Sequence, residues 1–309
     1  MKRIIPIFLV VILLGCSPKK EGNGRPLIVC TTGMVADAVI QLVDTQARVV
    51  SLMGPGVDPH LYKASQGDLE WLYDADMVIY SGLHLEGKMG EVLEKLSRIK
   101  PVHAMGSSID TSLLLNPSGY QGQWDPHIWF DLSLWSKAVD GLSKFLMQQF
   151  PDSKNSIVTA SNTYRESLLE THDWAKKSIG QIPVEQRVLV TAHDAFGYFG
   201  AAYDIEVVGL QGISTASEYG LRDVSEMVQL LSDRRIPSVF IESSIPRRSI
   251  EAVVDGCRRK GHDVRIGGTL FSDALGEKNT PESTLIGAFR YNVSTIVEGL
   301  KKPSHGNGT

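Results

Sequence analysis

Short runs of β-branched and other apolar residues alternate with longer amphipathic segments from Pro26 onward. The short runs predict strands and the longer segments predict helices. We expect strands at 27–31, 49–53, 77–81, 187–191, 205–208, 239–242 and 264–266. We expect helices at 34–43, 66–73, 88–96, 224–231, 248–260 and 282–300. Alternation of this kind predicts an α/β protein whose parallel sheets are covered by helices.

One segment between the two series of strands is different. Residues 153–179 contain neither Gly nor Pro and are bounded by Pro151 and Gly180. Helical spacing places five residues on one apolar face: Ile157, Tyr164, Leu168, Ala175 and Ile179. We therefore predict one linking helix at 153–180, about 40 Å long at 1.5 Å per residue, between an N-terminal lobe at 26–152 and a C-terminal lobe at 181–309. Because such a helix is stiff, we expect the lobes to close only slightly when a ligand binds. The alternative is that this helix is an ordinary amphipathic cover for one sheet.

The first residues have the pattern of an export signal. Lys2 and Arg3 precede an apolar run, 4–14, that is shorter than the roughly 20 residues of a spanning helix. The run ends in Leu-Leu-Gly-Cys at Cys16, which resembles a bacterial lipobox. We predict a lipoprotein signal peptide at 1–15, lipidation of Cys16 and a flexible tether at 16–25. A plain secretory signal with an incidental cysteine is the alternative.

Composition and charge exclude several classes of protein. With 42% apolar and 21% charged residues the chain resembles a folded protein rather than a disordered or collagen-like one. Its 31 Lys and Arg against 35 Asp and Glu provide no basic surface for nucleic acid. Three cysteines are too few for a disulfide framework, and we expect Cys30 and Cys257 to be buried thiols rather than a pair.

The triplet Asp-Pro-His occurs twice, at 58–60 and at 125–127. Each copy follows a loop and precedes a helical pattern. Because loops at the carboxyl ends of parallel strands converge on one edge of a sheet, we expect His60 and His127 to meet there.

The second half of the chain offers two more candidate ligands. The strand at 187–191 runs into His193, and Asp273 follows the last strand, which we expect to close at Gly267 and Gly268. Three imidazoles and one carboxylate suit Zn²⁺ or Mn²⁺ better than Ca²⁺ or Cu⁺. Four protein ligands with no open position indicate a held ion rather than a catalytic one. Metal binding requires neutral imidazoles, and the pKa of a histidine is ordinarily near 6.5. We therefore expect the affinity for the metal ion to fall steeply below about pH 6.

Other polar residues near these positions have weaker claims. Four acids could orient the imidazole rings, although surface solvation explains them equally well: Asp58, Asp125, Asp131 and Asp194. His84 beside Glu86 could be a spare ligand, but we favour a loop or cap role. No role is assigned to the remaining histidines, which are His103, His172, His262 and His305.

Several segments resemble those of the cluster A-I metal-binding lipoproteins, and within them the TroA-like group. They are GPGVDPHLY, GLHLEGKMGEV, DPHIWFD, LVTAHDAFGYFG, GLQGISTASE, FIESSIP and GGTLFSDALG. The resemblance covers nearly the whole mature chain. It implies two Rossmann-like lobes bridged by one long helix, with the family's four metal ligands falling on His60, His127, His193 and Asp273. It also implies a solute receptor, expected to be monomeric, that serves the permease of a bacterial zinc or manganese ABC importer.

The resemblance leaves the ion open. Dedicated zinc receptors of this family carry a His- and Asp-rich loop between the first two histidine ligands, whereas 107–123 contains only Asp110 and no histidine. More strictly manganese-selective members have a glutamate where this chain has His193. We expect an importer receptor for Zn²⁺ or Mn²⁺. The alternatives are a secreted metal-dependent hydrolase, with Glu242 as its general base, and a metal-stabilised adhesin.

Overall fold

A computed structural model describes residues 24–117, 120 and 122–301. The predicted signal peptide, Cys16 and the tether up to residue 23 lie outside the described residues, as does His305. Within the described ranges, none of the helices combines the length and the apolar character that crossing a bilayer requires.

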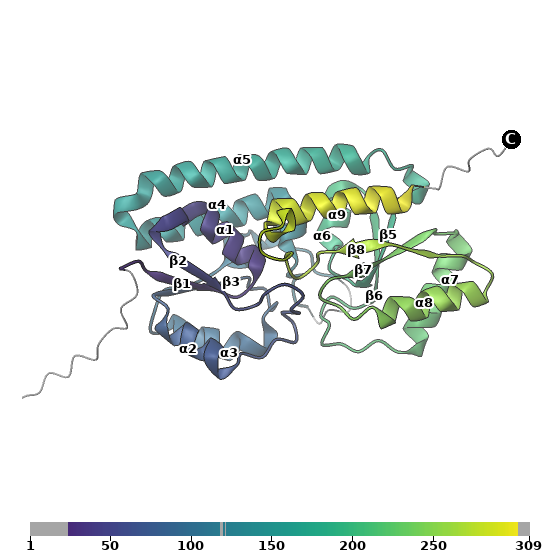
Figure 1. The fold of residues 1–309 in the computed structure, drawn as a ribbon, viewed down its shortest axis with the longest axis horizontal. Coiled ribbons are helices and arrows are strands. Elements are labelled where there is room, and N and C mark those ends of the chain that lie inside the picture. The colour runs from purple at the N-terminus through teal and green to yellow at the C-terminus, as the bar shows by residue number, and fades with distance from the viewer. Residues whose placement is uncertain (1–23, 118–119, 121, 302–309) are drawn as a thin grey trace, which may run out of the picture.

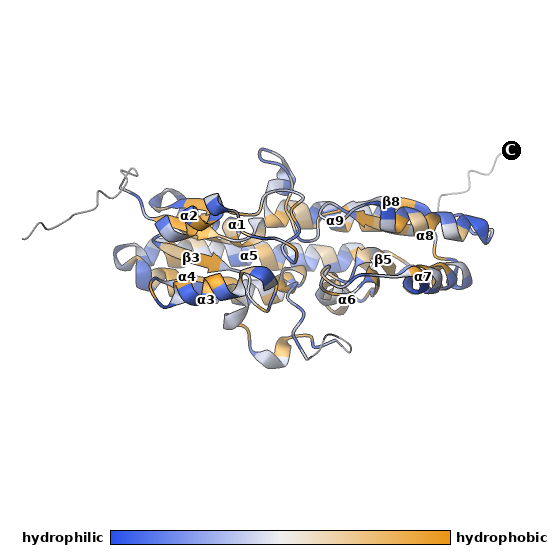
Figure 2. Cartoon of the chain, turned by 90° about the horizontal axis from the view of Figure 1, so that it is seen from below, coloured by the Kyte–Doolittle hydropathy of each residue, from blue (hydrophilic) through white to orange (hydrophobic). Residues whose placement is uncertain are grey.

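The N-terminal lobe is built on a parallel sheet with the strand order β2-β1-β3-β4. Its strands are β1 (Leu27–Cys30), β2 (Arg48–Ser51), β3 (Met77–Tyr80) and β4 (Val102–Ala104), and its helices are α1 (Gly33–Val43), α2 (Gln66–Asp74), α3 (Gly90–Ser97) and α4 (Leu132–Gln149). Along β1, Ile28 and Cys30 face α1 and α4, while Val29 faces α2 and α3. Both faces of the sheet are therefore covered (Figure 1), which explains why the central strands β1 and β3 are continuously apolar, as the orange colour at β3 in Figure 2 shows.

The C-terminal lobe repeats this layering. Its strands are β5 (Val188–His193), β6 (Glu206–Gln211), β7 (Ser238–Glu242) and β8 (Arg265–Leu270), and its helices are α6 (Gly197–Tyr203), α7 (Leu221–Arg234), α8 (Arg248–Arg259) and α9 (Leu285–Leu300). β5 pairs with β6, β7 pairs with β8, and β5 lies beside β7. Helices α7 and α8 cover one face, and α6 and α9 cover the other. The predicted α/β architecture is confirmed.

A single helix, α5 (Lys154–Ile179), runs along both lobes (Figure 1). It packs against α1 and α4 of the N-terminal lobe and against α6 and α9 of the C-terminal lobe. The apolar face predicted for it is buried, together with Ser161 and Thr171. The linking helix is thus confirmed, and it is more than a cover for one sheet. The lobe boundaries at 152 and 180 stay a prediction.

The last strand was predicted too short. β8 continues to Leu270, and its register against β7 shifts between Val239 and Phe240. Gly268 has φ 155°, and a Cβ on Gly267 would lie 2.8 Å from the Phe240 ring. The two glycines therefore do not end the strand but allow its irregular pairing and its close contact with α9.

Two smaller differences also concern element bounds. No bounds were predicted for α4, α6 or β4, and both helices contain glycine, which weakens the helical pattern in the sequence. The last helix begins at Leu285, since residues from Pro281 form a separate 3₁₀ turn. Cys30 and Cys257 are free and buried in opposite lobes, as predicted.

Candidate metal centre

The structure brings the four predicted ligands together between the lobes. One ligand atom from each of His60, His127, His193 and Asp273 lies within 4.8 Å of the others. All four side chains are buried. Two come from loops of the N-terminal lobe and two from the sheet edge of the C-terminal lobe.

The Nε2 atoms of the three imidazole rings face the Asp273 carboxylate. His127 Nε2 lies 3.4 Å from Asp273 Oδ1, and His193 Nε2 lies 3.2 Å from Asp273 Oδ2. His60 Nε2 lies 3.3 Å from His127 Nε2. Within the part of the chain that the structure describes, both oxygens of Asp273 and His193 Nε2 have no hydrogen-bond partner. A buried carboxylate without hydrogen bonds is costly, so the cluster has the chemistry of a cation site.

The two Asp-Pro-His triplets form the same local turn. Asp58 Oδ1 accepts a hydrogen bond from His60 N at 2.9 Å, and Asp125 Oδ1 accepts one from His127 N at 2.9 Å. Such a bond from an Asp side chain to the N–H two residues later is typical of Asx turns. The repeated triplet therefore fixes the backbone just before each candidate ligand.

Asp125 has a second role. The same oxygen, Oδ1, accepts from His127 Nδ1 at 2.7 Å. This bond keeps the proton on Nδ1 and directs the Nε2 lone pair into the cluster. Asp58 acts differently, since its other oxygen accepts from the hydroxyl of Thr215 at 2.6 Å across the lobes.

In the C-terminal lobe the candidate ligand His193 is the last residue of β5, and Glu242 is the last residue of the adjacent β7. Glu242 Oε1 accepts from His193 N at 2.9 Å, and Glu242 Oε2 lies 2.6 Å from His193 Nδ1. From the sequence, Glu242 is expected only as the general base of a hydrolase, and this orienting contact is not predicted. Its place at the end of a strand was the available signal.

The loop that carries Asp273 is anchored at its first residues. Trp129 of the N-terminal lobe donates to Ser272 O at 3.1 Å. The carboxamide of Asn292 on α9 accepts from Phe271 N at 2.9 Å and donates to Phe271 O at 2.7 Å. The carboxylate is therefore presented by a loop that both lobes hold.

Of the four predicted orienting acids only Asp125 bonds to a ring of the cluster in the described ranges, since Asp58 bonds to His60 N and Thr215 and the other two lie elsewhere. Asp131 caps α4 by accepting from the N–H groups of Ser133 and Leu134, and it lies 3.6 Å from His172 Nδ1. Asp194 forms no bond to a ring of the cluster in the described ranges, and its backbone N–H pairs with Gln211 O.

His84 is exposed and lies outside the cluster. Its neighbour Glu86 is buried and accepts hydrogen bonds from the Thr31 hydroxyl and the N–H groups of Ser81 and Gly82. The interpretation of His84 as a loop residue agrees with this arrangement.

The surroundings shift the pKa values of His60 and His127 in opposite directions. Burial lowers the pKa of His60 to about 3. Burial also disfavours a charged His127, but Asp125 and Asp273 outweigh it and raise that pKa to about 9. Burial raises the pKa of the Asp273 carboxyl, but His193 and His127 hold it well below its usual value. Without a metal ion the carboxylate is thus compensated by protons on its neighbours, which a metal must displace.

Comparison with known proteins identifies the family to which this chain belongs. Residues 28–299 match the family described as ZnuA, zinc-uptake complex component A periplasmic. The chain belongs to this family. The manganese-binding lipoprotein MntA of Bacillus subtilis (strain 168) is 47% identical over 298 residues, 96% of this chain and 97% of MntA. The zinc-binding protein TroA of Treponema pallidum (strain Nichols) is 45% identical over 286 residues, 93% of this chain and 92% of TroA.

The fold agrees with that assignment. The solved structure of the periplasmic zinc-binding protein TroA from Treponema pallidum superposes with a TM-score of 0.88 at 45% identity, covering 90% of this chain and 100% of that chain. The expected resemblance to the TroA-like metal receptors is therefore confirmed, and with it the two lobes bridged by one helix.

Proposed function

We propose that this chain is the substrate-binding component of a bacterial metal ABC importer. It captures Zn²⁺ or Mn²⁺ between its lobes through His60, His127, His193 and Asp273 and delivers the ion to a membrane permease. The observation that carries the proposal is the buried Asp273 carboxylate, whose oxygens have no hydrogen-bond donor among the described residues and which faces the Nε2 atoms of the imidazoles. Membership of the ZnuA family supports the same role.

The donor set supports either ion. Three imidazole nitrogens and a carboxylate fill a tetrahedral Zn²⁺ site. Both oxygens of Asp273 face the cluster, so the carboxylate can offer one or two atoms, as an ion that prefers more ligands requires. One close relative is named for manganese and another for zinc. We propose that the site binds both ions and that their supply decides which is carried.

The proposed location is outside the cytoplasm, with a lipid anchor on Cys16. The apolar run and the Leu-Leu-Gly-Cys sequence support export and lipidation. The name lipoprotein given to the Bacillus subtilis relative supports the same location. We propose that the protein acts as a monomer tethered beside its permease.

The hydrolase alternative is not favoured by the geometry. A general base would have to reach a water on the ion, whereas Glu242 lies at Nδ1 of His193, on the edge of the ring opposite Nε2. No observation favours the adhesin alternative.

Element analysis of the purified protein, followed by competitive titration with zinc and manganese, tests the proposal. We expect one ion per chain, displaced by the other metal. Deletion of the encoding gene should slow growth under metal limitation and reduce uptake of the same ion. A protein that binds neither metal, or a deletion strain with unchanged uptake, would contradict the proposal.

A further inference from the structure

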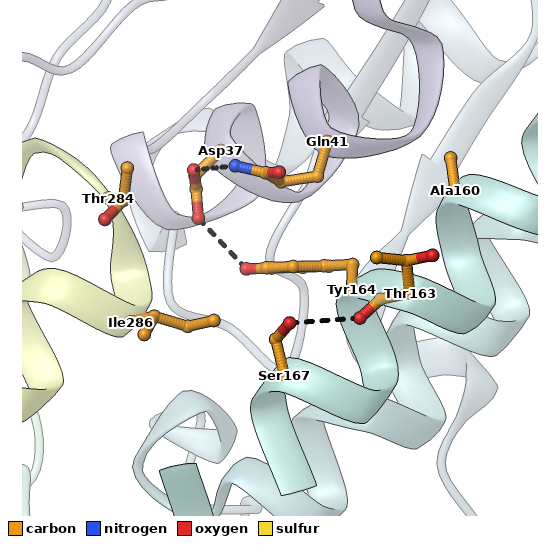
Figure 3. A pocket seen from close by; sticks show the side chains of 8 residues that line it. All are labelled: Asp37, Gln41, Ala160, Thr163, Tyr164, Ser167, Thr284 and Ile286. Atoms are coloured by element: carbon orange, nitrogen blue, oxygen red, sulfur yellow. Dashed lines mark hydrogen bonds between the residues drawn. The ribbon is translucent and has the colours of Figure 1, made fainter. Parts of the chain in front are cut away.

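A second buried carboxylate, Asp37 on α1, joins three parts of the molecule away from the cluster. Asp37 Oδ2 accepts from the Tyr164 hydroxyl on α5 at 2.9 Å and from Leu285 N of α9 at 3.1 Å. Gln41, one turn along α1, donates to the other oxygen at 3.3 Å. Figure 3 shows the carboxylate between Gln41 and the Tyr164 hydroxyl. We call the contact of Asp37 with Tyr164 and Leu285 the clasp.

The clasp satisfies the first N–H group of α9 with a side chain from the other lobe. Leu285 is the first residue of α9, and its N–H has no partner within its own helix. The N-terminal lobe supplies that partner as a carboxylate, which the positive end of the helix dipole also favours. A pocket of about 290 Å³ lies beside the clasp, between α1, α5 and α9. Side-chain packing alone therefore does not close this joint, and the hydrogen bonds connect the lobes there.

The clasp lies at one end of the loop that carries Asp273. Gly276 N donates to Glu282 O at 2.8 Å and closes this loop on itself. Near the start of the loop, Leu275 packs on Gly33, the first residue of α1, where a Cβ would lie 3.3 Å from Leu275 Cγ. Helix α1 thus contacts the loop at Leu275 and its end at Leu285.

We propose that Asp37 is a positioning residue for metal binding, which rests on the proposed function: the clasp holds the Asp273 loop of one lobe in register with the histidines of the other. The side chain does not touch the ion. It acts by keeping the C-terminal lobe and its carboxylate in the closed geometry, so that its loss speeds the departure of the metal.

The test compares three variants that alter bonds to the same carboxylate. Asp37→Asn keeps the shape but removes the charge that the Tyr164 hydroxyl and Leu285 N–H face. Metal dissociation into a chelator should become about tenfold faster, as expected for weakening of charge-assisted hydrogen bonds, while the stoichiometry stays the same. Tyr164→Phe removes only the hydrogen bond between α5 and Asp37 on α1. It should therefore give a smaller increase in the rate of metal dissociation, about threefold. Gln41→Leu is the matched control, because it removes a bond that stays within α1, and its rate should equal that of the unaltered protein.

A measurement on the metal-free protein tests the role of Asp37 independently of the proposed function. Hydrogen exchange of residues 271–285 in the metal-free protein should be about tenfold faster in Asp37→Asn than in the unaltered protein, with exchange of β7 unchanged. A merely structural role would lower the melting temperature without changing the dissociation rate or this local exchange.

Unchanged exchange in Asp37→Asn would overturn the clasp, as would dissociation rates within twofold of the unaltered protein in both clasp variants. An equal acceleration in Gln41→Leu would also overturn it, because the effect would then not depend on bonds between lobes. Absence of metal binding in the unaltered protein would refute the proposed function, and the exchange measurement would still decide whether Asp37 positions the loop.

Discussion

The two lobes hold their candidate ligands by different means. In the C-terminal lobe, His193 and its partner Glu242 end two neighbouring strands, so the sheet itself sets their separation. In the N-terminal lobe, His60 and His127 lie in loops beyond β2 and β4, and Asp-Pro-His turns hold them through side-chain hydrogen bonds. A carboxylate thus orients an imidazole in each lobe, but strand pairing places that carboxylate in the C-terminal lobe, whereas an Asp-Pro-His turn places it in the N-terminal lobe.

Asp273 should give the largest effect, because it is the cluster's anionic member and faces imidazoles from both lobes. We expect Asp273→Ala to weaken metal binding by more than about 100-fold, beyond the loss usual for an orienting residue. Competitive titration against a chelator measures the affinity. The control is His84→Ala, which alters an exposed histidine outside the cluster. Equal affinities in the two variants would remove Asp273 from the site.

The next largest effect is expected at Glu242, the carboxylate that orients His193 in the C-terminal lobe. Glu242 uses one oxygen for His193 N and the other at Nδ1. In Glu242→Gln one of these positions becomes an NH₂ group, and facing Nδ1 it would move the ring proton to Nε2, where the metal must bind. We expect about a 100-fold loss of affinity, the upper end for residues that orient a ligand.

Asp125→Asn is the matched variant in the other lobe. Asp125 uses a single oxygen for both His127 N and Nδ1, and the amide oxygen of asparagine can accept both bonds. We expect a loss of about tenfold, and calorimetric titration of the two variants under identical conditions checks the order. A larger loss in Asp125→Asn than in Glu242→Gln would reverse the comparison.

Acidity should weaken binding over a wider range than the sequence alone predicts. His127 has its pKa raised to about 9 in the metal-free cluster, so below that pH a metal must displace its proton. Affinity should therefore rise with pH up to about pH 9, by about tenfold per unit for each proton displaced. Proton release on binding near pH 7.5, measured by calorimetry in buffers of different ionisation enthalpy, checks this. Binding that releases no proton there would show that the imidazoles are already free.

The smallest expected effect is on overall shape. Helix α5 contacts both lobes, and Trp129 and Asp37 add bonds between them. We expect small-angle scattering profiles of metal-free and metal-loaded protein to superimpose closely. A gross difference would mean that the linking helix does not restrain the lobes.

Much of this arrangement could be predicted from the sequence, because its signals are local. The apolar runs identify buried strands, the unbroken segment 153–179 identifies α5, and the repeated triplet marks His60 and His127. The structure adds that these candidates converge with His193 and Asp273.

The missing features depend on spatial neighbours. Glu242 could not be assigned to His193 without knowing that β5 lies beside β7. The bond between Asp37 and Leu285 joins residues 248 positions apart and leaves no periodic trace in the chain. Gly267 and Gly268 are typical of a strand end, and only the fit against Phe240 and α9 explains their place inside β8.

Crystals of the zinc-loaded protein, measured at the zinc absorption edge, would locate the ion itself. We expect one anomalous peak between the lobes, about 2.0–2.2 Å from Nε2 of His60, His127 and His193 and from an oxygen of Asp273. A peak elsewhere, or these four side chains turned away from the ion, would contradict this expectation.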